Sequence, residues 1–157
     1  MRNRYLSGVI GFATAMAVTL ASGIAFAADS SGYKVVDGLT LYYAVVPAEM
    51  VRGHPKEHAE STMHGGIPKG MHSHHVMVAL FAGKDLERVT DAEVKATMGE
   101  VGLAGTQKRL ESFTVADALT YGNYFEFSPL TTYVIEFAIQ RPGSSKIVKS
   151  RVEYKHQ

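Results

Sequence analysis

The last part of the chain carries the most regular pattern in the sequence. Apolar residues alternate with more polar ones from Tyr133 to Gln140 and again from Val148 to Tyr154, and the turn-forming RPGSSK lies between the two runs. Alternation with a period of two places every second side chain on the same face of an extended chain. The pattern therefore predicts a β-hairpin with one buried face.

Shorter extended segments precede this hairpin. The Ala92–Met98 run could also form one short helix, but Gly99 and Gly102 follow it closely and favour a strand. The segments that we expect to be strands are Leu39–Val46 after an Asp37-Gly38 turn and before Pro47, His75–Ala82, Ala92–Met98, Gln107–Val115 and Tyr121–Phe127. With the hairpin they predict an all-β chain, an immunoglobulin-like antiparallel β-sandwich of about seven strands and no helix.

The N-terminus has the features of an export signal. Arg2 and Arg4 are followed by the uncharged and mostly apolar Ser7–Ile24 and then by the small-x-small triplet Ala25-Phe26-Ala27. This order predicts a signal peptide over residues 1–27, cleaved near Ala27, although the apolar run could also serve as an uncleaved anchor. We expect residues 28–157 to form a single β-sandwich domain in the periplasm, with no membrane span after cleavage.

Charge and cysteine content restrict the function. Without Arg2 and Arg4, 14 of the 16 basic residues remain against 15 acidic ones, and they form no basic stripe. Nucleic acid is therefore not an expected partner. The chain has no cysteine, which excludes thiolate metal sites and thioether attachment of haem. Sequence motifs of hydrolytic nucleophiles, HEXXH metalloproteases and phosphate-binding loops are absent as well, so we expect no enzyme.

The most unusual composition lies in a loop at 52–75, whose residues continue into the following strand. Six of the seven histidines and three methionines fall between His54 and Met77, together with several glycines and two prolines. Neutral imidazole is the commonest transition-metal ligand in proteins, and thioether sulfur adds a preference for Cu(I). The segment predicts a metal-binding loop, while a solvated, His-rich linker is the alternative.

The candidate ligands can be ordered by their position in the loop. A strand end is rigid, so His74 or His75 is the best-placed anchor, and Met63-His64 precedes two glycines that allow a tight turn. His64 and His75 are the expected core ligands. Adjacent histidines on a regular strand point to opposite faces, so one of His74 and His75 should lie where the backbone is irregular. His156, at the chain end, is expected to be disordered. The full candidate set is His54, His58, Met63, His64, His72, His74 and His75.

The order of the strand segments resembles that of a known group of exported domains. From HHVMVALF through DAEVKA, GNYFEF and TTYVIEFAIQRPG, the chain looks like the small immunoglobulin-like domains of the YtkA/FixH type. The His/Met-rich entry loop is also similar to that of CopC-like copper-handling sandwiches. The resemblance implies a β-sandwich that binds or delivers copper. The N-terminal His ligand of CopC-like proteins does not carry over, because the expected mature chain begins Ala28-Asp29.

Two functions follow from these patterns. The first is a periplasmic metal-binding protein, a chaperone or buffer, with copper as the expected ion, zinc or nickel as alternatives, and a metal donor or acceptor protein as a partner. The second is an interaction or assembly factor for a membrane or respiratory complex, for which metal would be incidental. In that case Tyr42, Tyr43, Tyr121 and Tyr124 could form an aromatic contact face.

Overall fold

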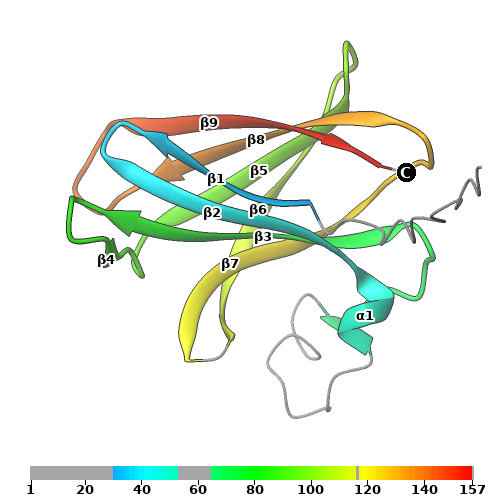
Figure 1. Cartoon of the computed structure of the whole chain (residues 1–157), viewed down its shortest axis with the longest axis horizontal. Coiled ribbons are helices and arrows are strands. Elements are labelled where there is room, and N and C mark those ends of the chain that lie inside the picture. The colour runs from blue at the N-terminus through cyan, green and yellow to red at the C-terminus, as the bar shows by residue number, and fades with distance from the viewer. Residues whose placement is uncertain (1–29, 53–64, 116, 157) are drawn as a thin grey trace, which may run out of the picture.

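The computed structural model describes residues 30–52, 65–115 and 117–156 and is almost entirely β-structure (Figure 1). One five-residue helix, α1 (Ala48–Arg52), interrupts the strands. None of the helical structure in these ranges is long and apolar enough to cross a membrane. The strands within these ranges are β1 (Ser30–Val36), β2 (Leu39–Pro47), β3 (Ser73–Ala82), β4 (Glu87–Arg88), β5 (Glu93–Glu100), β6 (Thr106–Val115), β7 (Ala118–Glu126), β8 (Thr132–Gln140) and β9 (Ile147–Lys155).

The strands form two antiparallel layers that share one long strand. Their order is β1-β2-β3-β7-β6-β5-β8-β9, with the short β4 paired to β3. The first half of β6 pairs with β5, as in Val94↔Leu110, and its second half pairs with β7, as in Phe113↔Thr120. On the opposite side β1 lies beside β9 (Figure 1). The all-β antiparallel class predicted from the sequence is confirmed.

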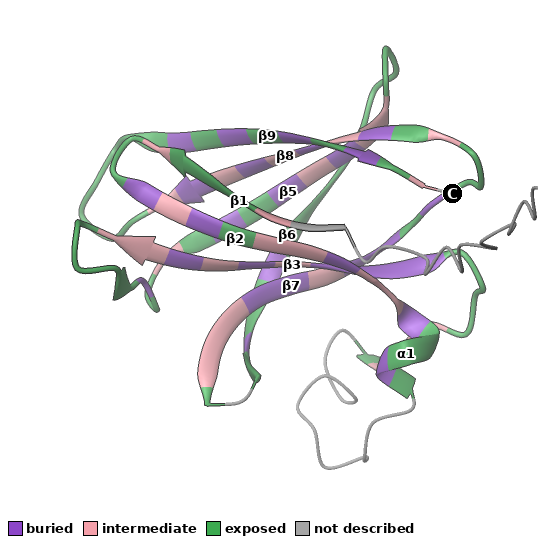
Figure 2. Ribbon diagram, in the orientation of Figure 1, coloured by how far each residue is buried: buried purple, intermediate pink, exposed green. Residues whose placement is uncertain are grey.

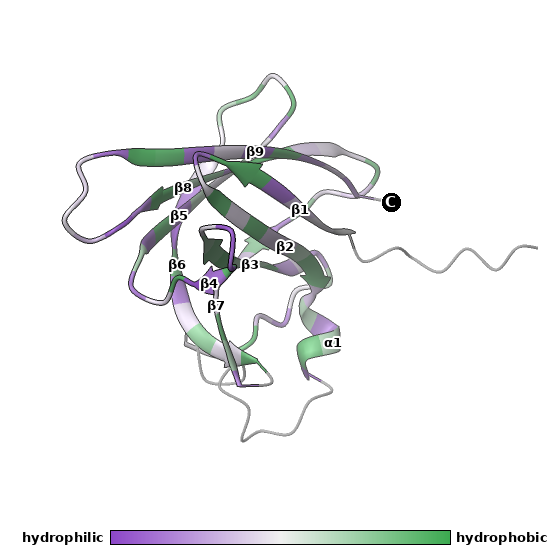
Figure 3. Ribbon diagram, turned by 60° about the vertical axis from the view of Figure 1, so that its left-hand side comes forward, coloured by the Kyte–Doolittle hydropathy of each residue, from purple (hydrophilic) through white to green (hydrophobic). Residues whose placement is uncertain are grey.

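The core lies between the two layers and follows the alternation of the sequence. In β8 and β9 every second residue is buried, which appears as regular banding along both strands (Figure 2). Hydrophobic residues also dominate β2 (Figure 3). Burial of this apolar surface is the main favourable contribution to folding. The largest fully buried apolar side chains are Phe125, Phe127, Phe137, Leu41, Leu80, Ile135 and Ile139.

The five segments expected to be strands before the hairpin lie close to β2, β3, β5, β6 and β7, and the expected C-terminal hairpin is β8 and β9. The turn before β2 is formed by Asp37 and Gly38, which have positive φ angles of 48° and 78°, as two-residue hairpin turns require. Pro47 is the last residue of β2, as expected. In addition to the seven expected strands, the structure has β1, the two-residue β4 and the short helix α1.

One end of the molecule gathers three parts of the chain. Pro47 at the end of β2 pairs with His74 near the start of β3, and α1 begins at the next residue, Ala48. Lys155 at the end of β9 pairs with Thr132. Helix α1, the start of β3 and the C-terminus therefore lie toward the same side of the fold (Figure 1). This end carries the histidines that the structure describes.

Candidate metal centre

The seven candidate ligands divide between described and undescribed parts of the chain. His54, His58, Met63 and His64 lie outside the described residues, so their expected convergence remains a prediction. His72, His74 and His75 lie within the described part, immediately before or inside β3.

His74 and His75 occupy opposite faces of β3. The strand begins at Ser73, two residues earlier than expected, so both histidines lie on regular backbone. The expectation that one of them would lie on irregular backbone was therefore wrong. Consecutive side chains of a strand point to opposite sides. These two imidazoles cannot bind one ion together in this arrangement.

His75 is packed within an aromatic stack on the outer face of its sheet. It is fully buried, and its ring stacks on Tyr124 at a centroid distance of 4.5 Å. Phe113 lies 5.1 Å away on the neighbouring part of the same face. A metal ion at His75 would have to displace part of this packing, although the position is as rigid as the sequence suggested.

His74 lies on the core side at the mouth of β3. It is only 3% exposed, and Phe127 contacts it edge-on at 4.8 Å between ring centroids. Its Nδ1 lies 3.1 Å from the carbonyl oxygen of His72. A carbonyl can only accept, so Nδ1 carries the proton of the neutral ring and donates it there. The lone pair of a neutral His74 is then on Nε2, the atom available to a metal.

His156 is the histidine whose role the sequence did not reveal. Its backbone N–H donates to the carbonyl oxygen of Thr131 at 2.9 Å, and its ring is half-buried. The ring lies 4.7 Å from that of His74, nearly perpendicular to it at 82°. Partial burial, together with the nearby imidazoles of His74 and His72, lowers the pKa of His156. The expectation of a disordered terminus was wrong.

A signal for His156 was present in the sequence. Alternate residues of β9 are buried, ending with Val152 and Tyr154. His156 continues the same parity and therefore the same face. The tyrosine hydroxyl oxygen of Tyr154 lies 3.4 Å from Nδ1 of His156. Extending the alternation by one step would have placed this imidazole at the end of the core.

Met71 and His72 are exposed residues that directly precede β3, the strand that carries His74. His72 is exposed, while its carbonyl oxygen also accepts the backbone N–H of Phe127 at 2.9 Å. Met71 is 80% exposed. Within the described ranges, no three or more His, Cys, Asp or Glu side chains are arranged to hold a metal ion. The described part of the chain thus contributes a pair of imidazoles.

A hydrogen bond holds together two residues that flank most of the His/Met segment. Arg52, the last residue of α1, donates from Nη1 to the carbonyl oxygen of Pro68 at 2.6 Å. Ser73 donates its hydroxyl to the Glu126 carboxylate, which fixes the entry into β3. The segment between Arg52 and Pro68 therefore leaves and re-enters the fold beside the strand end that carries His74.

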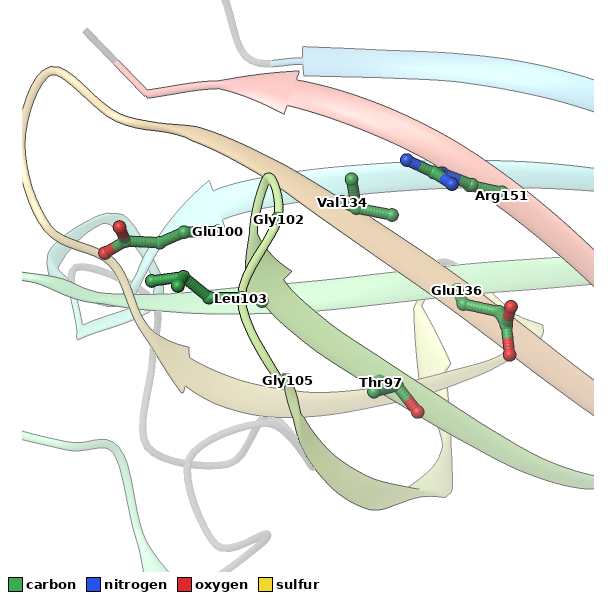
Figure 4. A pocket seen from close by; sticks show the side chains of 9 residues that line it. Thr97, Glu100, Gly102, Leu103, Gly105, Val134, Glu136 and Arg151 are labelled. Atoms are coloured by element: carbon green, nitrogen blue, oxygen red, sulfur yellow. The ribbon is translucent and has the colours of Figure 1, made fainter.

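A separate hollow on the other layer has no such donors. It encloses about 280 Å³ and is lined by residues of β5, β8, β9 and the β5–β6 turn (Figure 4). Glu100 and Glu136 lie at opposite ends of it (Figure 4), and Glu136 is paired with Lys149 at 3.0 Å. This hollow offers no cluster of imidazoles or thioethers.

The expected aromatic contact face is only partly formed. Tyr121 and Tyr124 are buried and cannot contact a partner, whereas Tyr42 is exposed. Tyr42 instead lies in a row with the exposed Tyr33, at a centroid distance of 5.9 Å, and the half-buried Phe81, at 5.5 Å. A hollow of about 420 Å³ beside this row is lined by apolar side chains that include Met77 and Val115.

Several solved structures have a similar fold, and some of them contain copper. A copper-bound variant of FetP from uropathogenic Escherichia coli matches with a TM-score of 0.59 at 12% identity, covering 82% of this chain and 95% of that one. Copper-reconstituted P19 from Campylobacter jejuni gives 0.59 at 12% identity, covering 80% and 93%. A DUF4426 family protein from Pseudomonas aeruginosa gives 0.58 at 15% identity, covering 81% and 96%.

At these identities the likeness concerns the fold. No protein-family model matches the sequence, and no curated protein sequence is significantly similar to it. The expected likeness to copper-handling β-sandwiches is supported at the level of the fold, because copper-bound proteins are among its structural neighbours. The resemblance to the YtkA/FixH type is not confirmed and stays a prediction.

Proposed function

We propose that this protein is a periplasmic copper-binding protein that acts as a chaperone or buffer and not as an enzyme. One observation carries the proposal: the His/Met-rich segment runs directly into β3, where the ring of His74 contacts that of His156. The fold is one that it shares with copper-bound FetP and P19. Export by the N-terminal signal, with cleavage near Ala27 and a single domain over 28–157, is part of the proposal.

The ligands that we propose come from the segment and from the strand that follows it. His64 and His75 remain the first candidates, with Met63, His58 and His54 contributing and His72 or His74 next. His74 would take part only in place of His75, because the two rings lie on opposite faces of β3. Imidazole together with thioether favours copper, whereas imidazole alone would also suit zinc or nickel. A metal donor or acceptor protein is the proposed partner, since a buffer or chaperone must exchange its ion.

Metal titration of the protein purified from the periplasm tests this function. We expect copper in the isolated protein and tight Cu(I) binding in competition with a chromophoric chelator. A dissociation constant no lower than about 1 mM would contradict the proposal. So would an affinity unchanged by His64→Ala combined with His75→Phe, which keeps an aromatic ring in the stack.

Lys69→Ala is the matched control for these substitutions. Lys69 lies in the same stretch and is exposed, but its charged ammonium is not a metal ligand at neutral pH. Copper affinity should be the same in this variant as in the unchanged protein. Titration with Zn(II) and Ni(II) under the same conditions would establish which ion the site prefers.

The exposed aromatic row supports a second candidate function. Tyr33 is 64% exposed, and with Tyr42 it borders the apolar hollow on the outer face of one sheet, while Phe81 contacts Tyr42 edge-on. Aromatic residues are enriched in protein interfaces. An assembly factor would retain its partner in a pull-down after chelation and after histidine replacement, and would lose it on Tyr33→Ser with Tyr42→Ser.

A further inference from the structure

Two histidines that are distant in the sequence meet at the end of the core. His74 comes from the start of β3, and His156 follows the last residue of β9. Their ring centroids are 4.7 Å apart, and the rings are nearly perpendicular. Each position is fixed by backbone structure: His74 by pairing with Phe125 and Pro47, and His156 by its hydrogen bond to Thr131.

We propose that His74 and His156 form a two-imidazole Cu(I) site at the C-terminal end of the fold. The inference rests on the proposed copper-binding function and adds His156, which the loop composition does not include. In this inference the residue that follows β9 is a ligand of the metal ion. The ion would bridge the two layers of the fold at the point where β3 and β9 end.

The contacts of the ring nitrogens are compatible with such a site. Donation from Nδ1 of His74 to the carbonyl oxygen of His72 leaves the lone pair on Nε2. The contact between His156 Nδ1 and the Tyr154 hydroxyl is long, at 3.4 Å, so it does not commit either nitrogen of that ring. Each neutral imidazole therefore keeps one unprotonated nitrogen, and binding one ion requires the edge-to-face rings to turn until these two nitrogens point at a common centre.

The surroundings of the pair favour an ion of low charge and low coordination number. Phe127 packs against His74 at 4.8 Å and lies 5.8 Å from His156, while Tyr154 stacks near His156 at 6.0 Å. These rings form an apolar wall, and a doubly charged ion is costly to place beside such a surface. Structural Zn(II) sites are almost always four-coordinate. Two neutral donors beside aromatic rings fit Cu(I) better.

A double-mutant cycle on the full-length exported protein tests the shared ion. Cu(I) affinity is measured anaerobically by competition for the unchanged protein, His74→Ala, His156→Ala and the double variant. If both rings bind one ion, we expect each single change to weaken binding by about tenfold or more, and the double change to cost clearly less than the two together. Additive losses, or no loss in His156→Ala, would overturn the inference.

Side-chain NMR provides a second measurement that does not depend on affinity. Ag(I), a redox-stable substitute for Cu(I), should shift one imidazole nitrogen each of His74 and His156 at the same stoichiometry. A shift at only one of the two rings would contradict the shared site. Lys155→Ala is the matched control, because it alters an exposed neighbour of His156 without removing a donor.

These outcomes separate the two proposals. Failure of the unchanged protein to bind Cu(I) would remove the proposed function and the inference together. Binding by the unchanged protein that is equally tight in His156→Ala would remove only the inference. His156→Ala is informative even if His74→Ala fails to fold, because His156 lies at the chain end, whereas His74 is buried.

Discussion

Gly122 lies directly against the ring of His75. A Cβ atom on Gly122 would be 2.6 Å from Nε2 of His75 and 2.9 Å from Cε1 of Phe113. Both distances are shorter than real Cβ contacts allow, and the His75 ring is held between Tyr124, on which it stacks, and Phe113. The close approach of this ring to the backbone of β7 therefore requires glycine.

Gly122→Ala should destabilise the protein by about 1–3 kcal/mol, the usual cost of overpacking a well-packed site. Urea denaturation measures the free energy of unfolding. Combining Gly122→Ala with His75→Ala should cost less than the two separate changes together, because the ring that the new methyl group meets is gone. Strict additivity would show that the close approach is not the cause.

The hydroxyl group of Tyr121 in β7 holds both ends of the segment that connects β4 to β5. It donates to the carbonyl oxygen of Val89 at 3.3 Å and accepts the backbone N–H of Ala92 at 3.2 Å. Tyr121→Phe removes both bonds in a buried site and should cost about 1–3 kcal/mol in unfolding free energy. Tyr42→Phe removes a hydroxyl from an exposed ring and should change stability by less than about 0.5 kcal/mol. Equal effects in the two variants would contradict the buried role of Tyr121.

The raised pKa of Tyr121 should make the protein less stable in alkali. Burial raises the pKa of Tyr121 above its usual value of 10.0, with Asp91 adding to the effect. The folded protein then keeps its proton at a pH where the unfolded chain releases it. This contribution to stability is fully present below about pH 10 and is lost as the pH rises through the folded pKa.

Denaturation curves from pH 8 to pH 11 test whether the free energy of unfolding falls in this way as the pH rises. The stability difference between the unchanged protein and Tyr121→Phe should shrink as the pH rises, because the phenylalanine variant has no proton to lose at this position. Tyr42→Phe controls for the general effect of alkali on the other tyrosines. A difference that stays constant over the range would show that Tyr121 does not titrate differently in the two states.

The sequence predicted most clearly those strands in which apolar and polar residues alternate regularly, and it missed a strand in which this alternation is interrupted. β8 and β9 were predicted because each has one buried face, so burial and sequence alternate together. β1 was missed because its Tyr33 and Val35 are exposed and its Gly32 interrupts the pattern. That glycine is needed because a Cβ there would lie 2.7 Å from the hydroxyl oxygen of Tyr43, a contact between strands that one segment alone does not reveal.

Local alternation also explains which part of the candidate site could be predicted from the sequence. Strand parity placed His74 and His75 on opposite faces, and the structure agrees. It could not place His156 beside His74, because that contact depends on the order of strands in both layers. Short-range patterns give the face of a side chain, whereas meetings between distant strands require the topology.

The hydrogen bond from Arg52 to the carbonyl oxygen of Pro68 should influence copper affinity more than overall stability. It holds together the two points at which the His/Met segment leaves and re-enters the described fold. Because the bond is exposed, Arg52→Ala should change overall stability by less than about 1 kcal/mol. Copper affinity should nevertheless fall several-fold, because ends that are free to separate lower the effective concentration of the donors around an ion.

Competition titration of Arg52→Ala, Arg52→Lys and the unchanged protein measures this effect. Lysine keeps one donor within reach of a carbonyl oxygen and should restore part of the affinity. Arg109→Ala is the matched control, since Arg109 is an exposed arginine of β6, away from the ends of the segment. If Arg52→Ala binds copper as tightly as Arg109→Ala, the ends of the segment need no tether, and metal binding depends on donors whose positions the bond does not influence.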